Sequence, residues 1–215
     1  MENKKVIVAV PGHTFSQKFL SSWTVCHREL LDLGWDVQLN VSYNSLTHRS
    51  RSIVMGYGRN MQFENPGKVP FDGLVEYDYM LLVDSDIIFT ADDFLKLVAD
   101  DKDVVSGMYK MRMDGGYSAY LDGSWITKEG IEAAAESPVI EADYGGLGFT
   151  LVKRHVLENT EGPMFFADKL EDNIGEDVTF FKRIQAAGFK TYWDTSVLVG
   201  HEAGYLMYED WILES

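Results

Sequence analysis

Apolar and polar positions in the first half of the chain follow two alternating periods. Short runs rich in Val, Ile and Leu predict strands, and stretches whose apolar residues recur every three or four positions predict helices. The predicted strands cover 4–10, 35–41, 79–84 and 103–109. The predicted helices cover 15–33, ended by Gly34, then a stretch that follows the polar loop "SYNSLTHRSRS" and runs to about Met61, and finally 91–100. This alternation predicts a mainly parallel sheet with helices on both faces.

The second half has a less regular pattern. Residues 110–141 carry glycine pairs and aromatic residues, which predict an irregular or antiparallel insertion. After it we expect a glycine turn, a strand and a helix start over 144–158, an amphipathic helix over 175–189, and strand-like segments near the end. No stretch resembles a linker. We therefore predict one α/β domain over 1–215, with a nucleotide-fold half at 1–109 and a more variable half at 110–215.

Composition is ordinary for a globular protein: of 215 residues, 46% are hydrophobic and 25% are charged. No apolar run approaches the roughly 20 residues of a membrane helix, so we expect no transmembrane segment. The Val- and Ile-rich start predicts a strand rather than a signal peptide. The single cysteine, Cys26, excludes an internal disulfide and favours a reducing compartment such as the cytoplasm.

The formal net charge of -15 narrows the possible partners. Binding of DNA or RNA without sequence preference needs lysines and arginines on phosphates, so no nucleic-acid partner is expected. An acidic protein that binds a phosphate must neutralise it locally, through a helix N-terminus, an arginine or a metal ion.

Two acids, Asp84 and Asp86, follow the apolar run of the third predicted strand in "LLVDSD". On a strand, residues two apart lie on one face, roughly 6.5–7 Å from each other, and two such carboxylates repel unless a cation is near. Oxygen ligands at the carboxyl end of a parallel strand suit Mg²⁺ or Mn²⁺. The alternative is a turn with a helix cap.

Two other interpretations of the acid pair fail. A calcium loop needs glycine at its sixth position, where Phe89 stands. A phosphatase nucleophile normally follows the first strand of its domain, and two strand–helix units precede Asp84.

Three further features each admit a functional and a purely structural explanation. Glu176 and Asp177 open the helix of "GEDVTFF", where acids also stabilise the helix dipole. His201 follows the apolar run "SVLVG" and is either a packed histidine or a metal ligand. The glycines of "DYGGLG" bring the backbone close to a ligand or form a tight turn.

In combination and in this order, "LLVDSD", "DYGGLGFTLVKR", "GEDVTFFKRIQAAGF" and "VLVGHEAG" resemble the GT-A-fold glycosyltransferases. The chain is most similar to the small family-2-like enzymes of bacteria, phages and large DNA viruses, and the resemblance covers nearly all of it. It implies a GT-A fold, with residues 1–109 binding the nucleotide and 110–215 facing the acceptor. It also implies a location in the cytoplasm of a bacterium or of an infected host cell.

The resemblance implies roles for individual residues. Asp86 matches the acid that binds a divalent metal on the donor diphosphate, His201 the histidine that completes this site, and Asp84 an acid near the ribose or a metal-bound water. Asp177 matches the general base of inverting members, and Glu176 would bind acceptor hydroxyls. Other donor and sugar contacts implied are Pro11, Gly12, His13, Ser85, Arg59 and Asn60 for the donor, and Gly145 and Gly146 beneath the sugar.

One departure concerns the nucleotide base. Many family members have an acid at the end of the second strand that contacts uracil, and here the stretch reads "LNVSYN". Tyr43 or Asn44 would make that contact instead. Aromatic residues of the second half, above all Tyr109 and Trp125, are candidates for stacking on a sugar acceptor, and the surrounding loop 110–125 is a candidate lid.

The function implied is Mn²⁺- or Mg²⁺-dependent transfer of one sugar from a nucleotide-diphosphate sugar, with a UDP-sugar favoured, to a glycan, protein or small-molecule hydroxyl. Inversion with Asp177 as base is expected, and a retaining mechanism stays open if Asp177 only caps its helix. Two other functions also stay open. One is a sugar-nucleotide nucleotidylyltransferase, for which "PGHTFSQK" is a poor match, and the other is a non-catalytic nucleotide-sugar or glycan-binding module.

Overall fold

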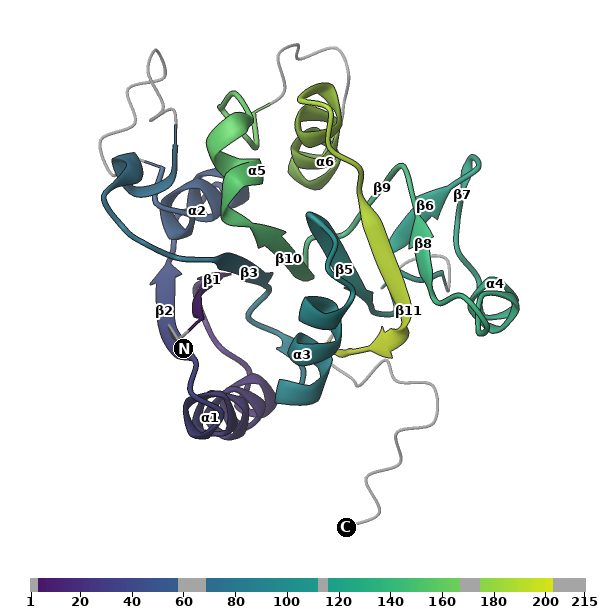
Figure 1. The fold of residues 1–215 in the computed structure, drawn as a ribbon, viewed down its shortest axis with the longest axis horizontal. Coiled ribbons are helices and arrows are strands. Elements are labelled where there is room, and N and C mark those ends of the chain that lie inside the picture. The colour runs from purple at the N-terminus through teal and green to yellow at the C-terminus, as the bar shows by residue number, and fades with distance from the viewer. Residues whose placement is uncertain (1–3, 58–68, 112–115, 167–174, 203–215) are drawn as a thin grey trace.

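The computed structural model describes residues 4–57, 69–111, 116–166 and 175–202. Its centre is a seven-stranded sheet in which five strands share one direction, while β10 and β8 run antiparallel to their neighbours (Figure 1). In order across the sheet, the strands are β2 (Asp36–Ser42), β1 (Lys5–Pro11), β3 (Tyr79–Val83), β10 (Phe149–Lys153), β5 (Val104–Met108), β11 (Tyr192–Leu198) and β8 (Val139–Glu141). The two halves of the sequence therefore share one mainly parallel sheet, and the fold is the predicted α/β fold.

Helices cover both faces of this sheet (Figure 1). One face carries α1 (Gln17–Asp32) and α3 (Ala91–Ala99). The other carries α2 (Thr47–Val54), α5 (Arg154–Asn159) and α6 (Glu176–Ala186). The short α4 (Lys128–Ala133) precedes β8, and a 3₁₀ turn covers Pro70–Gly73.

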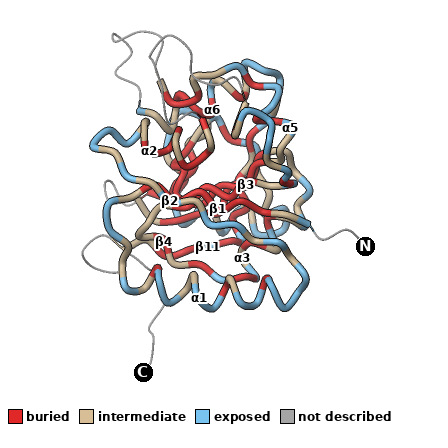
Figure 2. The backbone as a smooth tube through the Cα atoms, turned by 90° about the vertical axis from the view of Figure 1, so that its left-hand side faces the viewer, coloured by how far each residue is buried: buried red, intermediate tan, exposed pale blue. Residues whose placement is uncertain are grey.

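Two hydrophobic clusters, one on each side of the sheet, form the core. Alternate residues of β1 divide between them: Ile7 and Ala9 pack toward α2, α5 and α6, whereas Val6 and Val8 pack toward α1 and α3. This is the two-residue period of a strand that is buried on both faces. The inner strands β1, β3, β10 and β5 are accordingly buried, whereas the edge strand β2 is largely exposed, and exposed backbone lies on the outer sides of the helices (Figure 2).

Local signals explain why most predicted elements are confirmed. Ser16 caps α1 by accepting a hydrogen bond from the Phe19 N–H at 2.9 Å, and Gly34, at φ 83°, ends it in the left-handed region. Thr90 and Asp93 form a reciprocal capping box at the start of α3.

The only cysteine, Cys26, is buried and forms no disulfide, and burial raises the pKa of its thiol to about 12.

Two small sheets flank the central one. Strands β4 (Ile87–Ile88) and β12 (Gly200–His201) pair antiparallel and bring the last described residues beside the turn after β3. The expected antiparallel part of the second half is a three-stranded sheet of β7 (Ser124–Trp125), β6 (Ala119–Leu121) and β9 (Tyr144–Gly145).

The predicted position of the second helix is wrong. The helix begins inside the expected polar loop, at Thr47, and ends at Val54, where Gly56 at φ 81° follows. Its buried side includes Ser50, Arg51 and Ser52, which carry no apolar periodicity. The stretch from there to Met61 lies largely outside the described residues.

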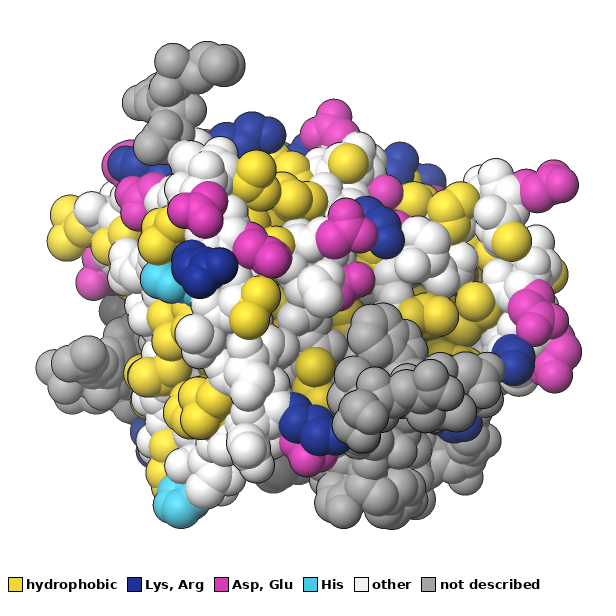
Figure 3. Space-filling model, turned by 90° about the horizontal axis from the view of Figure 1, so that it is seen from below, with side chains coloured by type: hydrophobic (Ala, Val, Ile, Leu, Met, Phe, Trp, Pro, Cys, Tyr) yellow, Lys and Arg dark blue, Asp and Glu magenta, His cyan; other side chains and the backbone are white. Residues whose placement is uncertain are grey.

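Surface properties match the composition. On the face formed by α1 and α3, charged side chains of both signs are interspersed with hydrophobic ones (Figure 3). Within the described ranges, none of the helices is both long enough and hydrophobic enough to cross a bilayer.

Candidate active site

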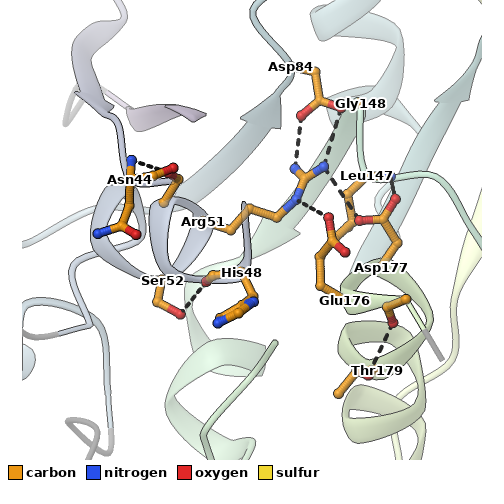
Figure 4. A network of polar contacts seen from close by, with 12 residues as sticks. Asn44, His48, Arg51, Ser52, Asp84, Leu147, Gly148, Glu176, Asp177 and Thr179 are labelled. Atoms are coloured by element: carbon orange, nitrogen blue, oxygen red, sulfur yellow. Dashed lines mark hydrogen bonds and ion pairs between the residues drawn. The ribbon is translucent and has the colours of Figure 1, made fainter. Parts of the chain in front are cut away.

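Four segments meet at the carboxyl end of β3: the turn that follows it, helix α2, the glycine segment 145–148 and the first turn of α6 (Figure 4). Because β10 is antiparallel and pairs Phe149 with Val83, the glycine segment that precedes it arrives at this same end. Ligand sites of open α/β sheets lie at the carboxyl ends of their parallel strands.

Asp84 and Asp86 do not share a strand face as expected, because β3 ends at Val83 and the acids lie in a turn. The Ile87 N–H donates to the Asp84 carbonyl at 3.1 Å, which closes that turn. The two carboxylates consequently have different partners. Asp84 faces Arg51 on α2, and Asp86 faces His201 on β12.

Arg51 is the centre of a carboxylate cluster that sequence reasoning missed. Its Nη1 and Nη2 lie 2.9 and 3.3 Å from the two carboxylate oxygens of Asp84. Its Nη2 lies 3.4 Å from Oδ1 of Asp177, and its Nε lies 3.7 Å from Oε1 of Glu176. Figure 4 shows the guanidinium between the turn after β3 and the start of α6.

The arginine side chain is 5% exposed and each of its three partners is 30% exposed. Burial alone would lower the pKa of Arg51, but Asp84 and Asp177 raise it above its ordinary value, so the guanidinium stays charged. The sequence signal that could have led to Arg51 is the net charge of -15, because an acidic protein that binds a phosphate needs a local cation such as an arginine.

Asp177 occupies a desolvated position at the start of α6. The Leu147 N–H donates to its Oδ2 over a long 3.4 Å, and its Oδ1 is turned toward Arg51. Burial raises the pKa of Asp177 to about 6, with Arg51 acting in the opposite direction and Asp84 and Glu176 adding to the rise. A carboxylate with this pKa is ionised at neutral pH and is a stronger base than an exposed aspartate.

His201 and Asp86 form a second polar pair. The register of β4 and β12 sets His201 opposite Ile87, and its Nε2 lies 3.7 Å from Oδ2 of Asp86. Its Nδ1 lies 2.9 Å from the Lys110 carbonyl, which can only accept, so Nδ1 carries a proton; in the neutral imidazole the lone pair is then on Nε2, the nitrogen nearer Asp86.

This pair fits a divalent metal ion. A metal-binding histidine usually donates its other N–H to a carbonyl or carboxylate, as His201 does to Lys110. Across the described ranges, no group of three or more His, Cys, Asp and Glu side chains is arranged to hold a metal. Mg²⁺ is usually held by one or two carboxylates, with phosphate and water filling its other positions, so a site of one carboxylate and one imidazole would leave room for a diphosphate.

The glycine segment is packed too tightly to carry side chains. A Cβ added to Gly146 would lie 1.9 Å from the Tyr109 hydroxyl, and one added to Gly145 would lie 2.0 Å from the Ser118 carbonyl oxygen. The Tyr109 hydroxyl in turn accepts the Gly148 N–H at 3.1 Å. Tyr109 is only 5% exposed, so its position suits support of this segment rather than the stacking on a sugar that we expected.

The turn after β1 lies against the acid turn. The Ser16 N–H donates to the Ser85 carbonyl at 3.2 Å, and a Cβ on Gly12 would lie 2.6 Å from the Ser85 hydroxyl. This places Gly12, which follows the last residue of β1, Pro11, beside Ser85.

The nucleotide-base candidates gather nearby. The rings of His13 and Tyr43 meet edge to face, 4.5 Å apart, and both residues are exposed. The Asn44 N–H donates to Ser50 on α2 at 2.6 Å. Arg59 and Asn60 lie outside the described residues.

Trp125 belongs to an aromatic cluster on the three-stranded sheet. Tyr120 and Tyr144 stack with ring centroids 4.5 Å apart and an interplanar angle of 10°. Trp125 meets them edge to face at 5.3 and 6.1 Å. All three rings are partly exposed, and Tyr144 directly precedes the glycine segment, so the cluster adjoins the candidate site.

The fold is the GT-A fold of nucleotide-diphospho-sugar transferases. The chain is similar to A197 from STIV, with a TM-score of 0.62 and 23% identity over 92% of this chain and 85% of that one. It is also similar to a mutant of Drosophila β1,4-galactosyltransferase 7 in complex with manganese, UDP-Gal and xylobiose. There the TM-score is 0.51 and the identity 14%, over 93% of this chain and 71% of that one.

No protein-family model matches the sequence, and no curated protein matches it. The likeness is therefore one of fold, and the case for a function rests on the residues of the site.

Proposed function

We propose that the chain transfers a single sugar from a nucleotide-diphosphate sugar to an acceptor hydroxyl with inversion at the anomeric carbon. The observation that carries this proposal is the setting of Asp177. Its carboxylate has a pKa raised to about 6 and lies in one cluster with Asp84, the first acid of the turn whose second acid faces His201. A base and a candidate metal pair thus flank the same end of the sheet.

Asp86 and His201 would hold Mn²⁺ or Mg²⁺ together with the donor diphosphate. When bound, such an ion supplies Lewis-acid stabilisation of the charge that develops on the leaving diphosphate. The ion would also supply positive charge next to the diphosphate, which a protein with a net charge of -15 needs. Arg51 meets only part of that need, because its guanidinium is already engaged by three carboxylates.

Asp177 acts as the general base in this proposal. It takes the proton of the acceptor hydroxyl while the acceptor oxygen bonds to the anomeric carbon, and the bond from that carbon to the diphosphate oxygen breaks with its electrons on the diphosphate. Glu176, beside it in the first turn of α6, is the candidate for binding a second acceptor hydroxyl.

Donor and acceptor have separate candidate surfaces. His13 and Tyr43 present exposed rings at the ends of β1 and β2 for the nucleotide base, and Pro11, Gly12, Ser85 and Asn44 line the same end. The cluster of Tyr120, Trp125 and Tyr144 offers aromatic faces to a carbohydrate acceptor. Gly145 and Gly146, the candidate sugar contacts, directly follow Tyr144 in the sequence. The UDP-Gal of the similar β1,4-galactosyltransferase 7 structure makes UDP-sugars the first donors to test.

The test is a donor screen followed by turnover. UDP-, GDP- and dTDP-sugars are ranked by thermal shift with Mn²⁺ and with EDTA, and sugar release from each donor is measured with and without acceptors. We expect one nucleotide series to stabilise the protein in a metal-dependent way and to be hydrolysed or transferred. A stabilising donor that is never turned over would instead support a non-catalytic binding module. Consumption of a donor only when pyrophosphate is added, with release of a nucleoside triphosphate and a sugar-1-phosphate, would support a nucleotidylyltransferase.

The Asp86→Ala variant tests the metal pair. We expect it to keep the wild-type melting temperature but to lose the Mn²⁺-dependent part of the donor shift and at least about 100-fold in turnover. Asp92→Ala is the matched control, because that carboxylate is 73% exposed on α3 and pairs with Lys96 one turn away. Wild-type turnover in Asp86→Ala would remove the metal pair from the mechanism.

A further inference from the structure

Arg51 joins three separate elements through one side chain. It projects from α2 and contacts Asp84 in the turn after β3 and both acids that open α6. These contacts connect residue 51 to residues 84, 176 and 177, so they are made only in the folded chain. The relative placement of the three elements and the placement of the acids on them are therefore linked through this guanidinium.

The guanidinium offsets the electrostatic repulsion among the three carboxylates. Three carboxylates gathered at one end of a sheet repel one another, and each is two-thirds or more removed from water. A planar guanidinium carries five N–H donors in a rigid fork, so it can face both oxygens of one carboxylate and still reach others, whereas an ammonium is a compact charge with three donors. Removing a cation from such a group leaves its acids uncompensated.

We propose that Arg51 is a positioning residue that holds the carboxylates of Asp84 and Asp177 at fixed places across α2, the turn after β3 and α6. This inference rests on the proposed function for its catalytic consequence. Arg51 takes no proton and forms no bond in the reaction. It acts through Asp177, whose carboxylate it fixes from one side while the Leu147 N–H holds it from the other.

The structural part is tested by a double-mutant cycle on the melting temperature. Arg51→Met should lower it by at least ~6 °C, because it leaves three partly buried acids without their cation. Adding Asp177→Asn should recover part of that loss, since one of the repelling charges is gone. Simple additivity of the two changes would overturn the proposal.

The matched control is Arg154→Met. Arg154 also pairs with two carboxylates, those of Glu76 and Glu158, but its side chain is 24% exposed and far more hydrated. We expect its removal to shift the melting temperature by no more than ~2 °C. If Arg51→Met does not fold, the same cycle is run with Arg51→Lys in its place.

The catalytic part is tested with Arg51→Lys, which keeps the positive charge but loses the planar array of guanidinium N–H donors. We expect it to fold, to keep the donor KM within about threefold, and to lose at least about tenfold in kcat, because an ammonium cannot contact both Asp84 oxygens and Asp177 in the fixed geometry of the guanidinium. Full kcat in Arg51→Lys would overturn the positioning role.

The two proposals fail separately. If the wild-type protein turns over no donor, the proposed function falls, while the thermal cycle still decides whether Arg51 positions Asp84 and Asp177.

Discussion

The proposed chemistry of the site depends on a single residue, Asp177, whose environment differs from that of an exposed aspartate. Loss of hydration raises its pKa to about 6, Arg51 limits the rise, and the acids beside it add to it. Relative to a free aspartate with a pKa near 3.9, the carboxylate is a base stronger by about two pKa units. At neutral pH it is nevertheless ionised, which is the state in which it can accept a proton.

The pH dependence follows from this direction. Since the folded-state pKa lies near 6, the base is ionised above that value and becomes protonated as the pH falls through it. We expect kcat/KM to be level above about pH 7 and to fall about tenfold per pH unit below about pH 6. A profile that is flat between pH 5 and 7 would contradict the role of Asp177.

Asp177→Asn should lower kcat by about 10²- to 10⁴-fold and leave donor binding intact, as measured by thermal shift. Asp122→Asn is a suitable control. Asp122 is an exposed turn residue at φ 51°, a conformation that Asn adopts as readily as Asp, so this change should leave kcat unaltered.

At the scale of elements, α2 shows where sequence reasoning fails. Helices α1 and α3 and strands β1 and β3 were predicted within a few residues because they bury apolar side chains at a regular period. Helix α2 buries polar side chains instead, each with its own partner. Ser50 bonds the Asn44 backbone, Ser52 donates to the His48 carbonyl, and Arg51 meets its carboxylates. A helix of this kind cannot be predicted from the pattern of hydrophobic residues.

Several residues of the candidate site could be predicted from the sequence, but most of their contacts could not be. Asp84, Asp86, Asp177 and His201 could be singled out because each follows an apolar strand run or lies in the first turn of a helix. Their partners could not be predicted, because these depend on a turn that separates Asp84 from Asp86 and on the pairing of two-residue strands that brings His201 to Asp86. Such contacts are set by the tertiary fold.

The contact between Tyr109 and the glycine segment makes a prediction at this scale. A Cβ at position 146 would lie 1.9 Å from the Tyr109 hydroxyl oxygen, so Gly146→Ala should lower the free energy of unfolding by about 1–3 kcal/mol, as overpacking does. Tyr109→Phe removes the clashing oxygen, and we expect the double variant to recover part of the loss in thermal denaturation. Equal stability of Gly146→Ala and the wild type would show that the segment can move away.

At the scale of the whole molecule, the dominant property is the charge of -15 on a protein proposed to bind a diphosphate. The described residues offer Arg51 and the first turn of α6 near the site, but Arg51 is bound by acids and the helix start carries two acids of its own. Within the described part of the chain, neither the diphosphate nor a metal ion alone has a full set of partners. Each supplies what the other lacks, so their binding should be strongly coupled.

This coupling is the prediction that belongs to the whole protein. With only Asp86 and His201 as ligands from the described part of the chain, Mn²⁺ alone should raise the melting temperature by less than ~1 °C, and UDP with EDTA should do no more. Together they should raise it by clearly more than the sum of the two shifts, because stabilisation grows with the logarithm of ligand concentration over Kd and each ligand lowers the Kd of the other by the same factor. Asp92→Ala should show the same coupling and Asp86→Ala none. A large shift with Mn²⁺ alone would mean that further side chains complete the metal site and that the diphosphate is not needed to build it.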